Sequence, residues 1–478
     1  MSAGREAPAG LRRVITAGGF FALSFGSIVG SGWVVLLGDW LNRASPGGAV
    51  LAILAGGSAM VLVGLCYAEL AVRYPRAGGE FVYILEAWGR TPAFVTGWFL
   101  TLYLIAICAF EGLAIAVLLQ TLFPRITADV VYVTLGEAIT WDALAIGLAG
   151  AAVIWGVNVA GTRVSLFLQR FITYGFIAVM AFLIGAGLVR GSWQNLTPFF
   201  GGAAGSGWPA GAAWIFGTCA VLLYGFQASI QAIEERAPHV SMQNVVRAMI
   251  GGIIAAAIFY CAVVVAAGRA LPWASLLDTR LPAAAAFGAL SPSGVLGTVV
   301  IVAAAASLVK TWNGIVLMAA RLVLAQARAG LLPRAFTGLN RAGAPAKAIA
   351  FVSLASIAGM LLGRGAIIPI INMAAMCVSA ATAICLVALL RLRRSGGTIP
   401  SFSTPGGTAT ISAALLLMLG MSASTFLEPL INARGSVPLE WILVLIWLVV
   451  GLAFARCTRA GRQAAAPGST PCTDISAR

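Results

Sequence analysis

The chain has very little charge for its length. Asp, Glu, Lys and Arg together make up 9% of its 478 residues, whereas hydrophobic residues make up 60%. A soluble globular domain carries roughly a quarter of its residues as charges, so this composition excludes that class. Apolar runs long enough to cross a bilayer recur along the chain and predict an all-α, multi-pass integral membrane protein.

Residues that build catalytic centres are also scarce. His239 is the only histidine and lies in an expected loop, so no Ser-His-Asp arrangement can be assembled. The eight cysteines are mostly scattered singly in apolar segments, without the pairing typical of metal sites. We therefore expect no enzyme, no bound metal and no cofactor. A membrane-embedded enzyme is the alternative that these absences argue against.

Twelve apolar segments are predicted to span the membrane, and no soluble domain interrupts them. They cover approximately residues 14–37, 46–72, 93–123, 138–159, 164–190, 209–233, 245–268, 291–325, 346–363, 366–391, 407–427 and 438–456. An even number of spans places both termini on one side of the membrane, with short polar tails at 1–13 and 458–478.

Positive charge is distributed unevenly between the two sides. Lys and Arg number 30 against 15 Asp and Glu, a net charge of +15, but most of these cations lie in loops on the side of the termini. The positive-inside rule therefore predicts cytoplasmic termini, and the excess does not indicate a nucleic acid partner. Nearly all cations are Arg, and Ala and Gly abound, which suggests a bacterial protein of the inner membrane.

The first apolar segment contains an unusual stretch, Phe25-Gly26-Ser27-Ile28-Val29-Gly30-Ser31-Gly32. Three glycines and two serines in eight residues weaken a helix, at about 1 kcal/mol for each glycine. Broken backbone at membrane depth is tolerated only where protein or a wet cavity surrounds it, and its free amides and carbonyls suit a carboxylate and an ammonium. The stretch predicts a membrane-buried site for a small zwitterion.

The same residues could instead serve helix packing or phosphate binding. The spacing of Gly26 and Gly30 suits close packing of two helices. A phosphate-binding loop is excluded, because no strand precedes the stretch and no Lys-Ser/Thr pair closes it. The sixth segment carries a second irregular centre, from Leu223 to Gln227. Its glycine and aromatic residues would be ordinary packing if that segment stood alone.

Four groups of residues resemble the amino acid–polyamine–organocation (APC) transporters. The motifs are the run 25–32, the loop Tyr74-Pro75-Arg76-Ala77-Gly78-Gly79-Glu80-Phe81-Val82-Tyr83 after Tyr67-Ala68-Glu69-Leu70, the stretch Tyr224-Gly225-Phe226 with Glu234-Glu235 and Pro238, and Arg321 with Ala327-Arg328-Ala329-Gly330-Leu331-Leu332-Pro333. They follow the family's order over about residues 14 to 345, and Gly78-Gly79-Glu80 is the most specific.

The resemblance implies a fold and a division of the chain. Members have a five-plus-five inverted repeat (LeuT-like) in which helices one and six are interrupted, followed by two extra helices. The repeats would be residues 14–191 and 209–392, and the extra pair 406–457.

The resemblance also implies which residues bind substrate. Ser27, with the amides of Ser31 and Gly32, would hold a carboxylate, and carbonyls near Ile28, Leu223 and Tyr224 would hold an ammonium. Tyr224 and Phe226 are candidates for an aromatic gate. The expected binding residues are Ser27, Ile28, Val29, Gly30, Ser31, Gly32, Leu223, Tyr224, Gly225, Phe226 and Gln227.

The chain departs from the family at two positions. Members often have an acid at the place of Gln227, so the neutral residue weakens the case for polyamines. Many members also have a lysine in helix five that replaces a sodium ion, and Phe176 occupies that place here. That mechanism therefore does not transfer directly.

Two charged residues, Glu111 and Lys310, fall inside predicted spans. Such residues cost at least about 2.5 kcal/mol at the bilayer centre and are usually functional. By the resemblance, helix eight approaches the break of helix one, so Lys310 is predicted to replace a coupling cation there. Glu111 would be its partner, a proton carrier or a reader of the substrate. A structural ion pair, or a lysine that snorkels to water, is the alternative.

Further charges cluster at the cytoplasmic ends of the predicted spans. Glu69, Glu234 and Glu235 lie near Arg76, Arg236 and Arg321 in the expected topology, which predicts an inner gate of salt bridges. An equally supported alternative is that these charges simply lie on a solvated surface.

These features predict a secondary transporter that moves an amino acid across the membrane by alternating access. Coupling to protons, or exchange, is favoured over sodium because of Lys310. The expected partners are a small amino acid and the lipid bilayer. The rivals are an amine or polyamine antiporter and, from another class, a channel or a transporter-like nutrient sensor.

Overall fold

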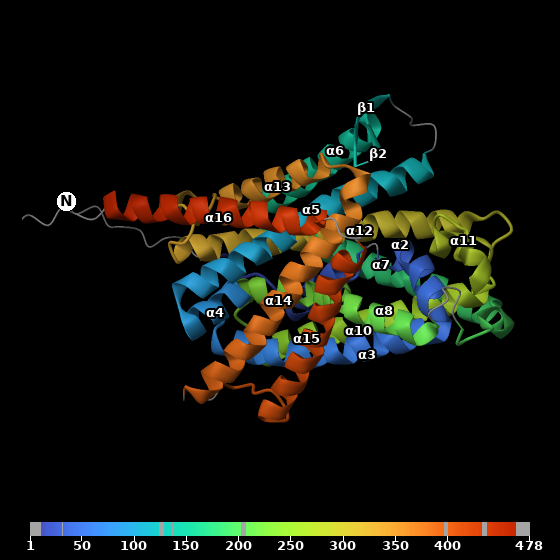
Figure 1. The fold of residues 1–478 in the computed structure, drawn as a ribbon, viewed down its shortest axis with the longest axis horizontal. Coiled ribbons are helices and arrows are strands. Elements are labelled where there is room, and N and C mark those ends of the chain that lie inside the picture. Colours follow the sequence, from blue (N-terminus) through green and yellow to red (C-terminus); the bar gives the residue numbers. More distant parts are fainter. Residues whose placement is uncertain are drawn as a thin grey trace, which may run out of the picture.

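The computed structural model describes residues 11–30, 32–123, 129–135, 137–201, 207–395, 400–432 and 437–464. Helices dominate it, as Figure 1 shows. The α-helices are α1 (Ala17–Ile28), α2 (Gly32–Val35), α3 (Leu37–Arg73), α4 (Glu80–Trp88), α5 (Arg90–Leu122), α6 (Trp141–Val159), α7 (Thr162–Arg190), α8 (Trp208–Leu222), α9 (Gln227–Gln231), α10 (Met242–Ala270), α11 (Pro282–Gly288), α12 (Val295–Arg328), α13 (Ala346–Met360), α14 (Ile367–Arg394), α15 (Gly407–Asn432) and α16 (Leu439–Ala464).

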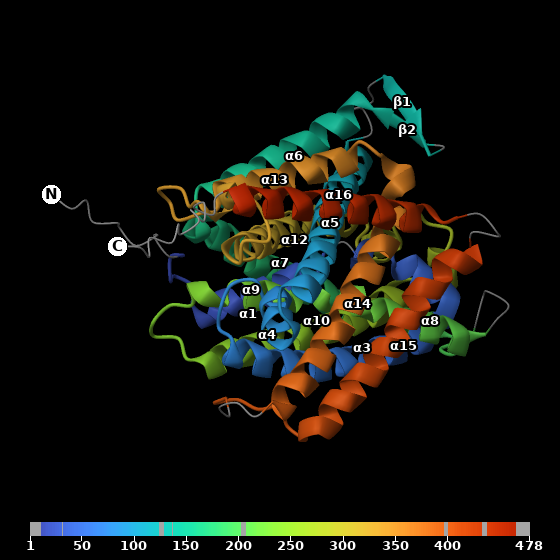
Figure 2. The ribbon, with the colours of Figure 1, turned by 60° about the vertical axis from the view of Figure 1, so that its left-hand side comes forward.

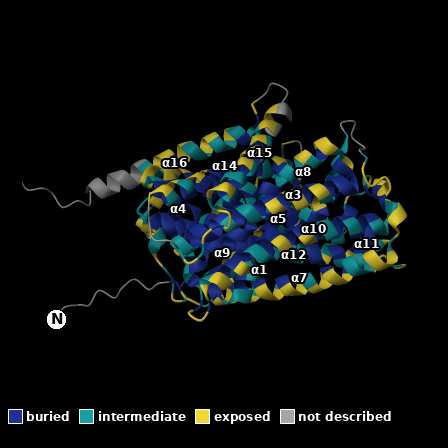
Figure 3. Ribbon diagram, turned by 90° about the horizontal axis from the view of Figure 1, so that it is seen from below, coloured by how far each residue is buried: buried dark blue, intermediate teal, exposed yellow. Residues whose placement is uncertain are grey.

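The described residues include ten helical segments that are long and apolar enough to cross a membrane. Two shorter apolar helices, Ala346–Met360 and Leu439–Ala455, lie where the ninth and twelfth spans are expected. The apolar side chains of Phe167 and Phe171 on α7 are each 72% exposed. Figure 3 shows further exposed residues along the same helix. An apolar surface of this kind suits lipid contact, so the protein is a multi-pass membrane protein.

The first span is broken where the sequence predicts. Thr16 caps α1, since its hydroxyl accepts a hydrogen bond from the Gly19 amide at 3.2 Å. The helix stops at Ile28, because Val29 leaves helical geometry with φ −87° and ψ 89°. The chain becomes helical again in α2 at Gly32, so the interruption lies within the serine- and glycine-rich run.

Helical structure continues past residue 37, the expected end of the first span. The long helix α3 contains Ser45 with φ 58° and ψ 172°, which divides it into residues 37–44 and 46–73. The Ser45 hydroxyl donates to the Phe199 carbonyl at 3.0 Å and accepts from the Gly201 amide at 3.1 Å. The expected loop at 38–45 is therefore mostly helical, and the kink lies at Ser45.

The sixth span is interrupted as well. Helix α8 ends at Leu222, a short 3-10 turn runs from Tyr224 to Phe226, and α9 follows. A second 3-10 turn, Ile233–Glu235, ends the segment. Helices α1 and α9 lie side by side in Figures 2 and 3, so the two interrupted spans are neighbours.

Three features depart from the expected topology. Residues 137–140, partly assigned to the fourth span, form strand β2 (Glu137–Thr140), which pairs with β1 (Val130–Thr134) in an antiparallel hairpin. The chain is thus not purely helical, because this segment lies outside the apolar core, where strand pairing satisfies its backbone. The expected polar tail from 458 begins as helix, since α16 continues to Ala464. Helices α4 and α11 occupy expected loops.

Figures 1 and 2 show α6 beside α13, and α14 beside α15. The interrupted spans are packed inside the bundle, and three quarters (76%) of the first span's apolar window is buried. By contrast, only 28% of the corresponding window of α7 is buried. The breaks therefore lie in protein rather than in lipid, as unpaired backbone at membrane depth requires.

Candidate functional site

The two breaks face each other across a contact that requires glycine. A Cβ atom on Gly225 would overlap the Ser27 backbone, and one on Gly314 would overlap the Ser27 hydroxyl. On the other side of α1, a Cβ atom on Gly26 would overlap the Gln169 amide. Because these glycines have no side chain, α12 and the second break can approach the backbone of the first.

Side chains from neighbouring helices satisfy the carbonyls that the first break exposes. Ser307 of α12 donates to the Val29 and Gly30 carbonyls at 2.7 and 3.1 Å. Thr311, one turn further, donates to the Gly26 and Val29 carbonyls at 3.0 and 3.2 Å. These oxygens form a polar cluster that could hold a small cation.

Lys310 occupies this cluster. Its Nζ donates to the Gly26 carbonyl at 3.1 Å and also to the Val29 carbonyl, and its side chain is fully buried. The ammonium also lies 4.9 Å from the ring centroid of Phe176 on α7, within the range of a cation–π contact. Phe176 of α7 therefore contacts the lysine of α12.

Glu111 of α5 approaches the same break. Its Oε1 lies 3.3 Å from the place that a Cβ atom on Gly30 would take, and its Oε2 has no hydrogen-bond partner. Among the described residues no ion pair within 4.0 Å joins Glu111 to Lys310. Both charges predicted inside the membrane thus lie at the first break, but a direct salt bridge between them is not formed.

Polar side chains behind Lys310 connect α6, α7 and α12. Asn313 donates to the Gln169 side chain at 3.0 Å and accepts from Asn158 at 2.9 Å and from Ser165 at 2.9 Å. Gln169 in turn donates to the Ala22 carbonyl of α1 at 3.2 Å. This network positions α12 against α1, and sequence reasoning did not identify it because its members are scattered over distant segments.

The second break differs in its side chains. The Tyr224 ring packs edge-to-face on Tyr103, and Phe226 packs edge-to-face on Tyr67. Leu223 is fully buried, and the buried Gln227 has a side-chain Nε2 without a partner. No acidic or basic side chain belongs to this break itself.

The structure places the remaining candidate binding residues as follows. Tyr260 donates to the Ile28 carbonyl at 3.1 Å, and the Gly30 amide donates to the same carbonyl at 3.1 Å. The Ser27 hydroxyl is buried without a hydrogen-bond partner. Ser31 lies outside the described residues.

The salt bridges expected for an inner gate form in part, with other partners. Arg321 pairs with Glu235 at 2.7 Å, both buried, and Thr162 hydrogen bonds to both. Glu69 pairs with Arg73 and with Arg393 rather than with Arg76.

Two more of the expected arginine pairings are also different. Glu234 pairs with Arg328, and Arg76 pairs with Glu86. The Arg236 side chain donates to the Val240 carbonyl instead of pairing with an acid. Sequence proximity misassigned these partners because α12 and α14 reach the site from distant parts of the chain.

A buried carboxyl that sequence reasoning did not assign to the site is Glu80, the first residue of α4. It is fully buried, and it accepts hydrogen bonds from the Tyr224 hydroxyl at 2.7 Å and from Gln231 at 3.0 Å. Burial raises its pKa to about 7, against the opposing effect of these two hydrogen bonds. The Gly78-Gly79-Glu80 motif was the signal that could have identified it.

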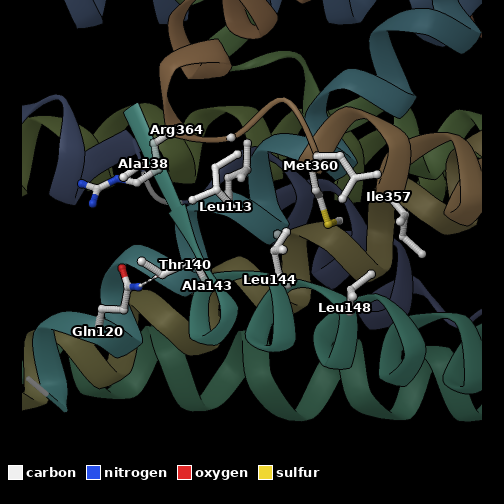
Figure 4. Close-up of a pocket in the computed structure, with 15 residues that line it drawn as sticks. Leu113, Gln120, Ala138, Thr140, Ala143, Leu144, Leu148, Ile357, Met360 and Arg364 are labelled. Carbon is white, nitrogen blue, oxygen red and sulfur yellow. Dashed lines mark hydrogen bonds between the residues drawn. The ribbon is translucent and has the colours of Figure 1, made fainter. Parts of the chain in front are cut away.

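A separate cavity of about 100 Å³ lies between α5, α6, α13 and the hairpin. Figure 4 shows it lined by Leu113, Leu144, Leu148, Ile357 and Met360, with Gln120 at one edge. Its walls are mostly apolar and carry no carboxylate, so they offer little to an amino acid's ammonium. In the described ranges no cluster of His, Cys, Asp and Glu could hold a metal ion.

Comparison with known proteins gives a consistent picture. The amino acid permease family model matches residues 19–453. The chain is 28% identical over 373 residues to the branched-chain amino acid permease BcaP of Lactococcus lactis, covering 74% of this chain and 76% of that protein. It is 36% identical over 116 residues to the amino-acid permease RocE of Bacillus subtilis, covering 24% and 25%.

A plant relative extends the range of the comparison. The chloroplastic cationic amino acid transporter 6 of Arabidopsis thaliana is 27% identical over 281 residues, which cover 58% of this chain and 48% of the plant protein. The family match spans both breaks, the lysine-bearing helix α12 and the Glu80 motif. The chain therefore belongs to the amino acid permease family of the APC superfamily.

Proposed function

We propose that this permease is a secondary active transporter that moves an amino acid by alternating access around the two breaks. The main support for the proposal is the pair of hydrogen bonds that Lys310 donates to the Gly26 and Val29 carbonyls. Backbone that is freed from helical bonding at membrane depth and bound by a charged side chain is typical of a transport site. The substrate carboxylate would meet the amides near Gly32, and its ammonium the carbonyls of the second break.

Lys310 acts in this proposal as a tethered coupling cation. A sodium ion needs oxygen ligands, and the ammonium occupies carbonyl oxygens that would otherwise serve as such ligands. When Lys310 gives up its proton, the positive charge leaves the break and the two helices are free to separate. Proton coupling or exchange is therefore favoured over sodium coupling. Glu111, beside Gly30, would accept a proton or read a polar substrate group.

The proposed membrane arrangement has twelve spans with cytoplasmic termini in a bacterial inner membrane. It treats the ten long apolar helices and the two shorter ones as spans, with the loop cations on the terminal side. The five-plus-five repeat is supported by the two breaks, which fall at its first and sixth positions. The repeats keep the proposed limits 14–191 and 209–392, followed by the pair 406–457.

The first test is uptake of labelled amino acids by the full chain in liposomes, driven by a proton gradient, a sodium gradient or trans-loaded substrate. We expect proton-driven uptake, and loss of it in Lys310→Met, because methionine keeps most of the volume without the charge. Arg328→Met, on the same helix but in an exposed pair with Glu234, is the matched control and should retain uptake. Sodium-driven uptake would contradict the role of Lys310.

The same vesicles separate the rival functions. An amine antiporter would show counterflow with amines that lack a carboxylate. The neutral Gln227 in the second break disfavours that outcome. A channel would show uptake that does not saturate, and a nutrient sensor would show binding without counterflow.

A further inference from the structure

The loop helix α4 brings one carboxyl group, that of Glu80, into contact with the second break. Gly78 and Gly79 precede it with φ +113° and +47°, conformations that favour glycine. A Cβ atom on Gly79 would lie 2.7 Å from the Gln231 amide, and one on Gly78 would overlap Ala325 of α12. The two glycines therefore let α4 begin directly against α9 and α12, with Glu80 as its first residue.

Among the residues that the structure describes, no cationic side chain pairs with Glu80. The titratable groups that face it are Tyr67 of α3, Tyr83 of α4 itself, Tyr103 of α5, Tyr224 of the second break and Cys385 of α14. All of these groups are neutral near pH 7. Within the described ranges no Lys or Arg lies within 4.0 Å of Glu80. Its negative charge is therefore stabilised by hydrogen bonds alone, from Tyr224, from Gln231 and from its own backbone amide.

The hydrogen-bond groups around Glu80 can serve either protonation state. The ionised carboxylate accepts from Tyr224 and Gln231, as observed. The Gln231 Oε1 has no hydrogen-bond partner, so it can accept from a protonated Glu80 after rotation of its amide. The Tyr83 hydroxyl is also buried without a partner. The cluster is therefore built to hold a proton as well as to release one.

We propose that Glu80 is a second proton-binding residue of the transport cycle, occupied while the cytoplasmic side is closed and emptied when that side opens. The inference rests on the transport function proposed above. In this proposal the closed state is the observed arrangement, in which the carboxyl group is buried against α9 and the second break. Water that reaches Glu80 on opening stabilises the ionised form, so the proton leaves to the cytoplasm. A proton entering with the substrate would thus have a defined point of release.

Linkage gives the sign of the pH dependence. A carboxyl with a raised pKa in the closed, folded state binds more protons there than in an open or unfolded state. Acid therefore favours the closed state. The stability contributed by Glu80 is complete below its ordinary pKa of 4.5 and is lost as the pH rises through about 7.

The first measurement is the melting temperature of the purified full chain in detergent across this pH window, for the wild type and Glu80→Gln. The difference between the two isolates Glu80, since Lys310 is present in both. We expect the wild type to lose stability relative to Glu80→Gln as the pH rises. Glu86→Gln, on the same helix but in an exposed pair with Arg76, should follow the wild type. A difference that is independent of pH would overturn the proposal.

The second measurement is counterflow of a labelled amino acid with equal pH on both sides. We expect the wild-type rate to change by about tenfold between about pH 6 and pH 8, as the occupied fraction of Glu80 falls. Glu80→Gln should lose this part of the profile, and Glu86→Gln should keep it. An unchanged profile in Glu80→Gln would overturn the role in transport, whatever the melting data show.

If Glu80→Gln does not fold, Glu80→Asp provides the test instead. Glu80→Asp keeps a titratable group with a shorter reach, so both profiles should shift along the pH axis, and unshifted profiles would count against the proposal. Failure of the transport proposal is recognised separately. Vesicles of the wild type would then show no saturable counterflow at any pH, while the melting difference between wild type and Glu80→Gln would still depend on pH.

Discussion

The two interrupted helices are broken by different means. At the first break, side chains of α12 and α10 take over the freed carbonyls, and two charged residues approach it. At the second break, a 3-10 turn from Tyr224 to Phe226 keeps local backbone bonding, and aromatic rings surround it. The first break is therefore defined by hydrogen bonds and charge, whereas the second is defined by shape.

This difference suggests that the two breaks have different roles in transport. The charged break suits coupling, because the gain or loss of a proton changes its hold on the helix directly. The neutral break suits recognition of the substrate, because its walls are shaped by Gly225 and by aromatic side chains. A titratable carboxyl group nevertheless contacts the second break. It belongs to Glu80, which lies outside the break and accepts a hydrogen bond from the Tyr224 hydroxyl.

The largest expected effect tests whether one buried ion pair holds both broken helices together. Ile15, just before α1, bonds to the backbone of residues 235 and 237, and the Glu235 side chain holds Arg321. Glu235→Gln leaves the Arg321 charge buried without its partner, which should cost about 3–5 kcal/mol of folding free energy. Thermal melting in detergent would show this loss, with transport falling in parallel.

Glu234→Gln is the matched control for this variant. Glu234 is the adjacent residue, but its pair with Arg328 is 28% and 37% exposed. Solvent screens such a pair, so its loss should cost under about 1 kcal/mol. Equal losses in the two variants would show that the buried pair does not lock the helices.

The next effect tests whether the second break is defined by shape. In Gly225→Ala the new Cβ would overlap the Ser27 backbone, so the two breaks must move apart. Such overpacking costs about 1–3 kcal/mol and should abolish uptake even where the protein still folds. Gly251→Ala on α10 meets nothing within 4 Å and should leave both melting and uptake unchanged. Retained uptake in Gly225→Ala would mean that the contact is not needed.

The smallest effect tests whether the first break is defined by its hydrogen bonds. Ser307→Ala removes one donor from the Val29 and Gly30 carbonyls, and Lys310 and Thr311 still serve Val29. We expect a loss of about 1 kcal/mol in melting and a higher KM for uptake. The control Ser422→Ala removes a buried hydroxyl of α15 that donates to the Met418 carbonyl of the same helix. A KM unchanged in Ser307→Ala would weaken the distinction between the breaks.

Sequence alone predicted the membrane class of this protein and much of its helical arrangement. The membrane class and most span limits followed from composition and apolar length, because burial in lipid is a local requirement on each segment. The break at residues 25–32 was visible for the same reason, since serine and glycine weaken a helix wherever they stand. The hairpin at 130–140 and the helical residues 38–44 were missed, because local signals for them are weak.

Only the tertiary structure determined which residues far apart in the sequence contact each other. Lys310 and the Gly26 carbonyl are 284 residues apart in the sequence, and Glu80 and Tyr224 are 144 apart. The choice of Arg393 rather than Arg76 as a partner of Glu69 was equally invisible in the sequence. Hydropathy and helix propensity act between near neighbours, whereas these contacts depend on how whole helices pack. The chain thus determines its spans segment by segment, and packing decides which charges share a site.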